Sequence, residues 1–244
     1  MVNNGELKLP RFRKSPSPKL YWISLAAIFA AVWIWAAINP LFRHDWLLEN
    51  YLVFFGVPLI LLSGFYFQLS RISYGLITVF MCLHVIGSRY TYAEVPFGYT
   101  LQRWLGADRN MYDRLVHFCF GFLLAYPIRE LFLRVAKVRG FWGFFLPLDV
   151  TLAFSAIYEI IEWLAAANVD PAAGLAFLGS QGDVWDTQKD MTCAGVGALL
   201  SMLVIAAINW KFNPDFWHEL KQSLKLRRDD KPLGEEKIRE WMEH

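Results

Sequence analysis

Long apolar runs constrain the fold of this chain more than any other feature of its sequence. Residues 20–38, 51–70 and 191–210 each contain no Asp, Glu, Lys or Arg. About 20 consecutive apolar residues are enough to cross the hydrocarbon core of a bilayer as a helix, and a charge buried there is costly. The sequence therefore predicts an all-α integral membrane protein.

The apolar runs and the polar turns between them predict a bundle of about six transmembrane helices. The predicted spans are residues 20–38, 46–69, 72–92, 111–133, 141–167 and 191–210. Polar loops at 93–110 and 168–189 follow the third and the fifth span. We expect three parts: a basic cytoplasmic segment at 1–19, a six-span membrane domain at 20–210, and a charged cytoplasmic tail at 211–244.

The overall composition agrees with a membrane environment. The chain is 56% hydrophobic and 19% charged, whereas an average soluble domain carries about 25% charged residues. The cysteines are Cys82, Cys119 and Cys193, all within apolar runs. An odd number of cysteines offers no disulfide framework, so we interpret them as small buried hydrophobic side chains.

The distribution of Lys and Arg predicts how the bundle is oriented. If the N-terminus lies inside, the inner segments hold 18 of the 24 Lys and Arg residues and the outer segments hold 6. Cytoplasmic loops carry the excess of Lys and Arg in membrane proteins. With an even number of spans, we expect both termini in the cytoplasm.

In this topology several ionisable residues fall at one depth, near the outer ends of the spans. They are Asp113, His117, Glu159, Glu162, Asp183, Asp186 and Asp190, with His84 and Arg89 in the outer half of the third span. The four-residue spacing places Asp113 and His117 on one helix face. Charged groups in a membrane normally face the bundle interior and pair there. So many converging carboxylates require arginines, protons or a metal ion to neutralise them.

A divalent metal ion suits this set of donors. Histidine nitrogen with carboxylate oxygen binds Zn²⁺, Mn²⁺ or iron, and Glu and His from facing helices form metal sites in bundles. The predicted metal ligands are Asp113, His117, Glu162 and Asp190. The predicted catalytic residues are Glu159, Glu162 and Asp186. We expect Arg89 and Arg114 to bind substrate, because a guanidinium group presents two parallel donors to an anionic head group.

Each residue also has a structural interpretation. Asp113 can pair with Arg109 or Arg114 or cap its helix, and Asp183 can cap the sixth span. His84 stands alone on an apolar span, where a core histidine with satisfied hydrogen bonds is the more frequent case. Two other functions therefore stay open. One is a cation or proton-coupled transporter, in which Asp, Glu and His mark the path. The other is a non-catalytic membrane partner, in which the acids form ion pairs with arginines.

Three motifs carry a resemblance to a known family. The segments YDRLVHF at 112–118, EIIEW at 159–163 and QGDVWDTQKDM at 181–191 resemble the YjdF-like family of bacterial inner-membrane proteins. The resemblance covers roughly the second to the sixth span, and the last motif is the most specific. It implies a multi-pass protein of the bacterial inner membrane and supplies no activity.

A more distant similarity links the chain to VanZ-like membrane proteins. The shared features are the segment from Asp113 to Phe118, an acid in the next span at Glu159, and Asp190 at the start of the following span. VanZ-like proteins are associated with glycopeptide resistance and the cell surface. The chain departs from them at Glu162, where Gln is expected.

Together these features predict a metal-dependent enzyme at the outer leaflet. A bound metal ion could activate water and polarise a phosphoryl or carbonyl group. We expect hydrolysis or group transfer on a lipid-linked or amphiphilic substrate. The expected partners are the lipid bilayer and that substrate, and no nucleic acid.

Overall fold

The computed structural model describes residues 19–168, 174, 178, 180–225, 238–239 and 241–243, and these residues form helices joined by turns. The helices are α1 (Lys19–Ala37), α2 (Arg43–Glu49), α3 (Tyr51–Tyr66), α4 (Arg71–Arg89), α5 (Pro96–Leu105), α6 (Tyr112–Arg134), α7 (Trp142–Ala167), α9 (Asp186–Phe212) and α10 (Phe216–Ser223). No strand occurs among the described residues. The expected segment 1–19 lies outside them except for Lys19, as does much of the expected tail.

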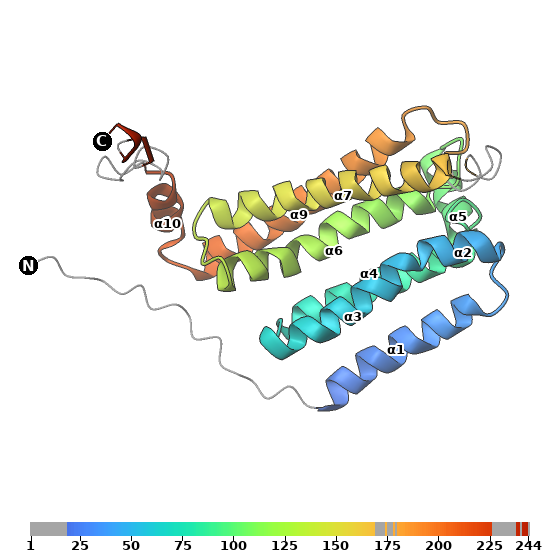
Figure 1. The fold of residues 1–244 in the computed structure, drawn as a ribbon, viewed down its shortest axis with the longest axis horizontal. Coiled ribbons are helices and arrows are strands. Elements are labelled where there is room, and N and C mark those ends of the chain that lie inside the picture. The colour runs from blue at the N-terminus through green and yellow to red at the C-terminus, as the bar shows by residue number, and fades with distance from the viewer. Residues whose placement is uncertain are drawn as a thin grey trace, which may run out of the picture.

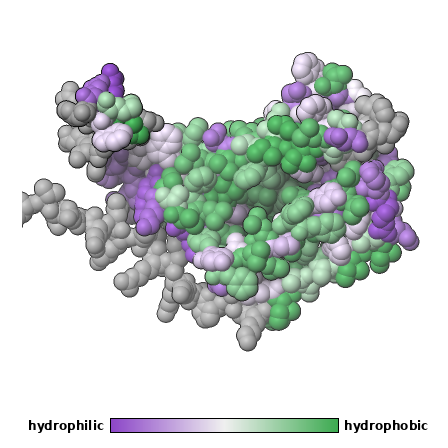
Figure 2. Space-filling view, viewed as in Figure 1, coloured by the Kyte–Doolittle hydropathy of each residue, from purple (hydrophilic) through white to green (hydrophobic). Residues whose placement is uncertain are grey.

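Six helical segments are long and apolar enough to cross a membrane, which confirms the predicted all-α fold. They are Leu20–Ala37, Arg43–Tyr66, Arg71–Arg89, Tyr112–Arg134, Trp142–Ala167 and Asp186–Phe212. Their outward side chains are largely apolar, so hydrophobic residues cover the middle of the face in Figure 2, and hydrophilic ones gather toward its two ends. A surface of this kind suits a hydrocarbon solvent.

Two predicted boundaries were wrong for identifiable reasons. The loop at 93–110 contains the helix α5, because Pro96 occupies its first turn and Gly106 ends it in the left-handed conformation, with φ of 62°. Both residues suggest a loop in isolation, yet this is their usual placement at helix ends. The sixth span begins at Asp186 rather than at 191, and the acids of its first turn, Asp186 and Asp190, pair with arginines.

The helices pack as two groups that meet along α4 and α6 (Figure 1). One group contains α6, α7 and α9, and in the other α1 packs against α4. Hydrogen bonds to Asn50 join helices of the second group. The indole Nε1 of Trp33 on α1 donates to Asn50 Oδ1 at 2.8 Å, and Asn50 Nδ2 donates to Ser88 Oγ on α4 at 3.3 Å. Asn50 lies between α2 and α3 and is completely buried, so these bonds fix the turn between them.

Small residues bring α6 and α9 into backbone contact. A Cβ atom on Gly121 would lie 1.8 Å from the carbonyl oxygen of Ala194, and one on Gly197 would lie 2.1 Å from that of Phe118. Small residues permit such close helix approach in membranes. This contact sets the position of the first turns of α6 and α9, which carry most of the candidate site.

Candidate functional site

The predicted acids meet at one end of the bundle, which we call the acidic end. It is formed by the starts of α6 and α9 and the end of α7, and it lies opposite α10 (Figure 1). Alternating helix directions produce this arrangement, because α6 and α9 leave this end and α7 arrives at it. The convergence predicted from span order alone is therefore present in the fold.

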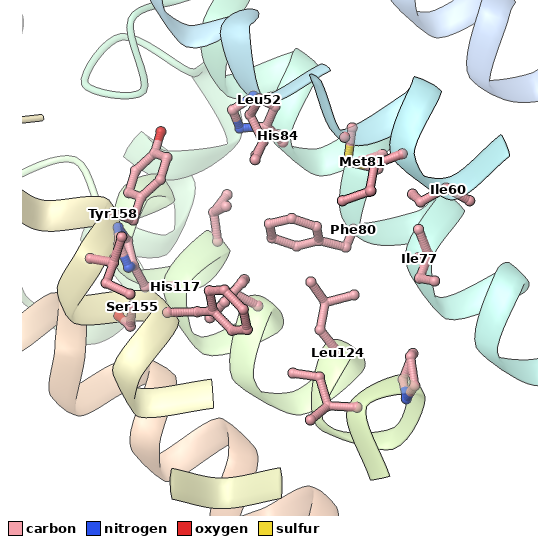
Figure 3. Close-up of a pocket in the computed structure, with 18 of the residues that line it drawn as sticks. Leu52, Ile60, Ile77, Phe80, Met81, His84, His117, Leu124, Ser155 and Tyr158 are labelled. Atoms are coloured by element: carbon pink, nitrogen blue, oxygen red, sulfur yellow. The ribbon is translucent and has the colours of Figure 1, made fainter. Parts of the chain in front are cut away.

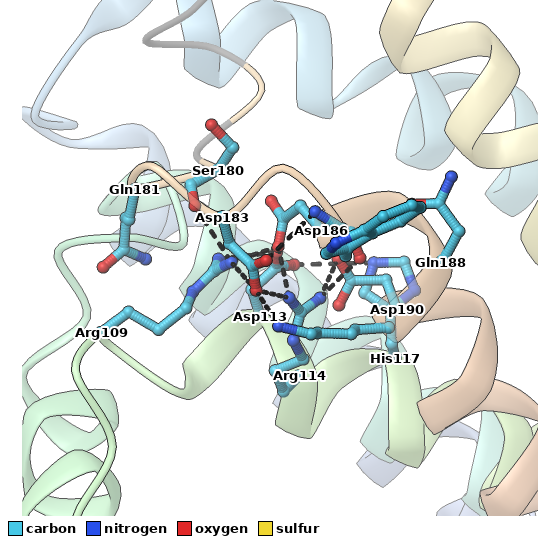
Figure 4. A network of polar contacts seen from close by, with 12 residues as sticks. Arg109, Asp113, Arg114, His117, Ser180, Gln181, Asp183, Asp186, Gln188 and Asp190 are labelled. Atoms are coloured by element: carbon cyan, nitrogen blue, oxygen red, sulfur yellow. Dashed lines mark hydrogen bonds and ion pairs between the residues drawn. The ribbon is translucent and has the colours of Figure 1, made fainter.

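Two arginines form the centre of an ion-pair network at this end (Figure 4). Arg109 pairs with Asp186 and lies 3.7 Å from an oxygen of Asp113. Arg114 pairs with Asp190, with Asp186 at 2.5 Å and with Asp183 at 3.2 Å. Both arginines are buried, as are Asp186 and Asp190. The network therefore ties α6 and the residues before it to the start of α9.

Asp183 lies in the loop before α9 and is partly exposed. The Lys189 ammonium donates to it at 2.7 Å and holds the pKa of that carboxyl below its usual range. Asp183 also accepts from the backbone N–H of Trp185 at 3.1 Å. It is thus an ionised residue that shapes the loop and helps to hold Arg114.

A second cluster lies beside the arginines and consists of Asp113, His117, Asp190 and Glu159. One ligand atom from each of the first three lies within 4.8 Å of the others. The Nε2 atom of His117 is 3.6 Å from Asp113 Oδ1 and 3.5 Å from Glu159 Oε1. The cluster therefore brings donors from α6 and α9 around one point, and Glu159 of α7 lies beside His117.

Two carboxylate oxygens in this cluster accept no hydrogen bond from the residues that the structure describes. They are Glu159 Oε1 and Asp190 Oδ1, and their residues are only 6% and 3% exposed. The other oxygen of Asp190 is held by Arg114. A buried polar atom without a hydrogen bond is costly, so a proton, a water molecule or a cation at either oxygen would stabilise it.

Negative charge exceeds positive charge around the cluster. Six carboxylates line a cavity of about 170 Å³, which we call the polar cavity: Asp113, Glu159, Glu162, Asp183, Asp186 and Asp190. The basic side chains paired with them are Arg109, Arg114 and Lys189. Protons or a cation must therefore balance the remaining acids. The cavity is also large enough for several water molecules, since one water needs only about 10–15 Å³.

A further group of polar side chains, which was not predicted from the sequence, adjoins the cluster. The hydroxyl of Tyr158 donates to Glu49 Oε2 at 2.9 Å, which joins α7 to α2. Glu49 is 7% exposed and is the last residue of α2. The helical spacing of Tyr158 and Glu162 was the available signal, since both lie on one face of α7.

His84 has the structural role expected of a core histidine. Its Nε2 lies 3.0 Å from the backbone carbonyl of Glu49, and its Nδ1 lies 2.5 Å from the hydroxyl of Tyr92. A carbonyl oxygen can only accept, so Nε2 carries the proton and Nδ1 accepts from Tyr92. Burial raises the pKa of Tyr92 well above its usual range, which keeps that hydroxyl a donor.

A larger cavity of about 770 Å³ extends from the acidic end between α3, α4, α6 and α7. We call it the groove. Figure 3 shows Phe80, Met81 and Leu124 along it, with His117 and Tyr158 toward one side. Asp113 and Glu162 line both the groove and the polar cavity. These two carboxylates therefore stand where an apolar space meets a polar one.

The structure brings together most of the predicted site residues. Asp113, His117, Glu159 and Asp190 share the cluster, and Glu162 lines the adjoining cavity. Asp186 and Arg114 contact each other in the arginine network.

Arg89 has other partners. Its guanidinium group donates to the backbone carbonyls of Trp35 and Ile38, the latter at 2.5 Å, and lies 4.4 Å from the centre of the Trp35 ring. Arg89 therefore caps the end of α1, and its contacts do not place it in the cluster.

The fold and the site define a helical membrane protein with six spans and a polar, acid-rich site at one end of the bundle. The chain belongs to the family described as predicted membrane protein DUF2238, which it matches over residues 21–211. It is 41% identical over 182 residues to the inner membrane protein YjdF of Escherichia coli strain K12, covering 74% of this chain and 87% of that protein. No solved structure matches the chain.

Proposed function

We propose that this protein is a metal-dependent enzyme of the bacterial inner membrane that acts on a lipid-linked or amphiphilic substrate. The single observation that carries the proposal is the cluster of Asp113, His117 and Asp190, beside which buried oxygens of Glu159 and Asp190 accept no hydrogen bond from the described residues. The name of the E. coli relative supports the inner-membrane location.

The donor set fits a divalent cation by distance and by chemistry. Ligands bound at about 2.0–2.6 Å can lie at most about 4–5 Å apart on opposite sides of an ion, and the three ligand atoms lie within 4.8 Å of one another. One histidine with carboxylates suits Zn²⁺, Mn²⁺ or iron. Arg114 holds one oxygen of Asp190 and leaves the other oxygen toward the cluster, as outer-shell partners do in metal sites.

The residues around the cluster divide into ligands, proton acceptors and supports. A bound metal would supply Lewis acidity toward a phosphoryl or carbonyl oxygen and a more acidic water. In hydrolysis the water oxygen bonds to the phosphorus or carbonyl carbon, the bond to the leaving group breaks, and a nearby carboxylate takes the proton. We assign that carboxylate to Glu162 or Glu159. Asp186 orients Arg109 and Arg114. The terminal nitrogens of Arg114 already contact Asp183, Asp186 and Asp190, so we assign Arg114 to positioning these carboxylates.

Orientation belongs to the same proposal. The excess of Lys and Arg in the N-terminal segment, the α6–α7 turn and the tail supports a cytoplasmic position for both termini. The acidic end then faces outward, so the substrate is approached from the outer leaflet.

The experiment is a measurement of bound metal. Wild-type protein, His117→Ala and Glu159→Gln are purified in detergent, and metal is determined by mass spectrometry before and after treatment with chelator. We expect wild-type protein to retain near-stoichiometric metal. His117→Ala removes a proposed ligand and should lower metal affinity by more than about 100-fold, whereas Glu159→Gln changes an adjoining acid and should lower it by the about 10–100-fold typical of an outer-shell residue.

Glu94→Gln is the matched control. Glu94 is exposed and accepts a hydrogen bond from Tyr99 at 2.6 Å, so the same change of charge is made outside the cluster. Its metal content should equal that of wild-type protein. A wild-type protein that is folded without metal, and whose thermal stability a chelator leaves unchanged, would contradict the proposal.

The same measurements distinguish a non-catalytic partner, and the lining of the groove bears on a transporter. A non-catalytic partner with structural ion pairs predicts lower protein levels in all acid variants and no metal in any. A transporter needs a polar path across the membrane, and beyond Phe120 the described lining of the groove toward Val135 carries no ionisable side chain. The groove therefore favours an apolar occupant over a conducted ion.

A further inference from the structure

The groove is apolar along most of its length and polar at one end. Most of the residues that line it are apolar. They include Leu59 and Ile60 on α3, Ile77 and Phe80 on α4, and Leu124 on α6. Among the described residues that line it, the ionisable ones lie near the acidic end: Asp113, His84, His117, Tyr92, Tyr158 and Glu162. An amphiphile matches this distribution, with its head at the acidic end and its hydrocarbon chain along the apolar part.

The groove is longer than one leaflet of a membrane. Its lining residues on α6 run from Asp113 to Leu131, and at about 1.5 Å per residue they span about 27 Å. The hydrocarbon core of a bilayer is about 30 Å thick, so one leaflet contributes about 15 Å. The chain of an ordinary phospholipid fills one leaflet, and it would leave the far half of the groove without contacts.

The rim of the groove faces the surrounding lipid. Leu59 on α3 is 68% exposed and Ile161 on α7 is 56% exposed, and both line the groove. A membrane-dissolved molecule can therefore reach the groove from the side.

We propose that the groove binds a single hydrocarbon chain longer than one leaflet, of the polyisoprenoid class, as a phosphate ester. The placement of the phosphate at the acidic end rests on the proposed function, because carboxylates alone repel phosphate and a bound cation attracts it. The placement of the hydrocarbon chain rests on the length and the apolar lining of the groove. Contacts along the whole chain add many small dispersion terms, so affinity increases with chain length until the groove is full.

Two glycines of α3 provide a matched pair of variants. Gly56 lines the groove, and a Cβ atom on it would meet nothing within 4 Å. Gly64 lies outside the groove lining, and its Cβ would meet only the Tyr74 hydroxyl at 3.9 Å. Leucine at either position improves helix propensity by a similar amount. Only Gly56→Leu places a side chain in the groove.

The experiment measures binding of three phosphate monoesters to purified protein by native mass spectrometry. The probes are undecaprenyl phosphate, farnesyl phosphate and dioleoyl phosphatidic acid, and inorganic phosphate tests the head group alone. We expect undecaprenyl phosphate to bind at least about tenfold more tightly than the other two lipids, which corresponds to about 1.4 kcal/mol. Gly56→Leu should remove at least this advantage, and Gly64→Leu should keep it.

Equal affinity for farnesyl and undecaprenyl phosphate, tighter binding of phosphatidic acid, or an unchanged advantage in Gly56→Leu would each overturn the inference. Metal content is measured on the same preparations. If the protein contains metal but its affinity does not depend on the length of the hydrocarbon chain, the groove occupant is refuted and the metal proposal is not. Protein without metal that still binds undecaprenyl phosphate in a Gly56-dependent way supports the groove occupant and refutes the metal centre.

Discussion

Arg114 connects the start of α6 to the start of α9 through aspartates. Its guanidinium group contacts the side chains of Asp183, Asp186 and Asp190, and it also donates to the backbone carbonyl of Asp186 at 2.9 Å. Removal of one partner from a buried ion pair leaves an uncompensated charge, which costs more than the pair itself contributes. Arg114 therefore controls both the stability of this end and the orientation of Asp190.

We predict that Arg114→Met lowers the free energy of unfolding by about 3–5 kcal/mol, because Asp186 and Asp190 remain buried with less compensation. The measurement is thermal or denaturant unfolding of purified protein in detergent. Arg103→Met is the control, since Arg103 is exposed on α5. Equal stability of the two variants would show that the arginine network contributes little.

The residues of the site were predictable from sequence to a definite extent. Span order alone brings Asp113, Glu159 and Asp190 to one end, because each successive helix reverses direction. The partner of a side chain depends on helix rotation and tilt, which span order leaves open. For this reason Arg89 was expected near the acids although it caps α1, and the bond from Tyr158 to Glu49 was not foreseen.

At the scale of elements, the long helices were predictable and the short ones were not. The six spans follow from hydropathy, since a bilayer requires an apolar helix of defined length. The helix α5 lies in a polar segment, where local end signals from Pro96 and Gly106 decide the structure. The break between α2 and α3 depends on the buried contacts of Asn50, which join distant parts of the chain.

Close contact between α6 and α9 leads to a prediction about two glycines on one helix. A Cβ on Gly197 would meet the backbone oxygen of Phe118 at 2.1 Å, whereas one on Gly195 would meet side-chain atoms of Leu152, the nearest at 2.8 Å. A side chain can move aside and a helix backbone cannot without separating the helices. Gly197→Ala should therefore destabilise the protein by about 1–3 kcal/mol through overpacking, and Gly195→Ala by clearly less.

Unfolding of the two alanine variants side by side checks this prediction, and metal content provides a second readout. Separation of α6 from α9 moves His117 away from Asp190, so Gly197→Ala should also bind metal more weakly. Equal stability in Gly195→Ala and Gly197→Ala would contradict the close packing of these helices.

For the whole molecule, the proposed orientation can be tested with reporter fusions. Alkaline phosphatase needs disulfides and becomes active only outside the cytoplasm. We predict activity for fusions after Ala107, which lies between α5 and α6, and none for fusions after Arg139, which lies between α6 and α7. The opposite pattern would place the acidic end in the cytoplasm and reverse the proposed side of action.

The exposed rim at Leu59 and Ile161 determines how a ligand would find this protein. A molecule that enters between α3 and α7 stays dissolved in hydrocarbon and never crosses water on its way to the carboxylates. Its search is confined to a plane. Occupancy would then depend on how many such molecules are present per unit area of membrane, and their concentration in the surrounding aqueous medium would matter little.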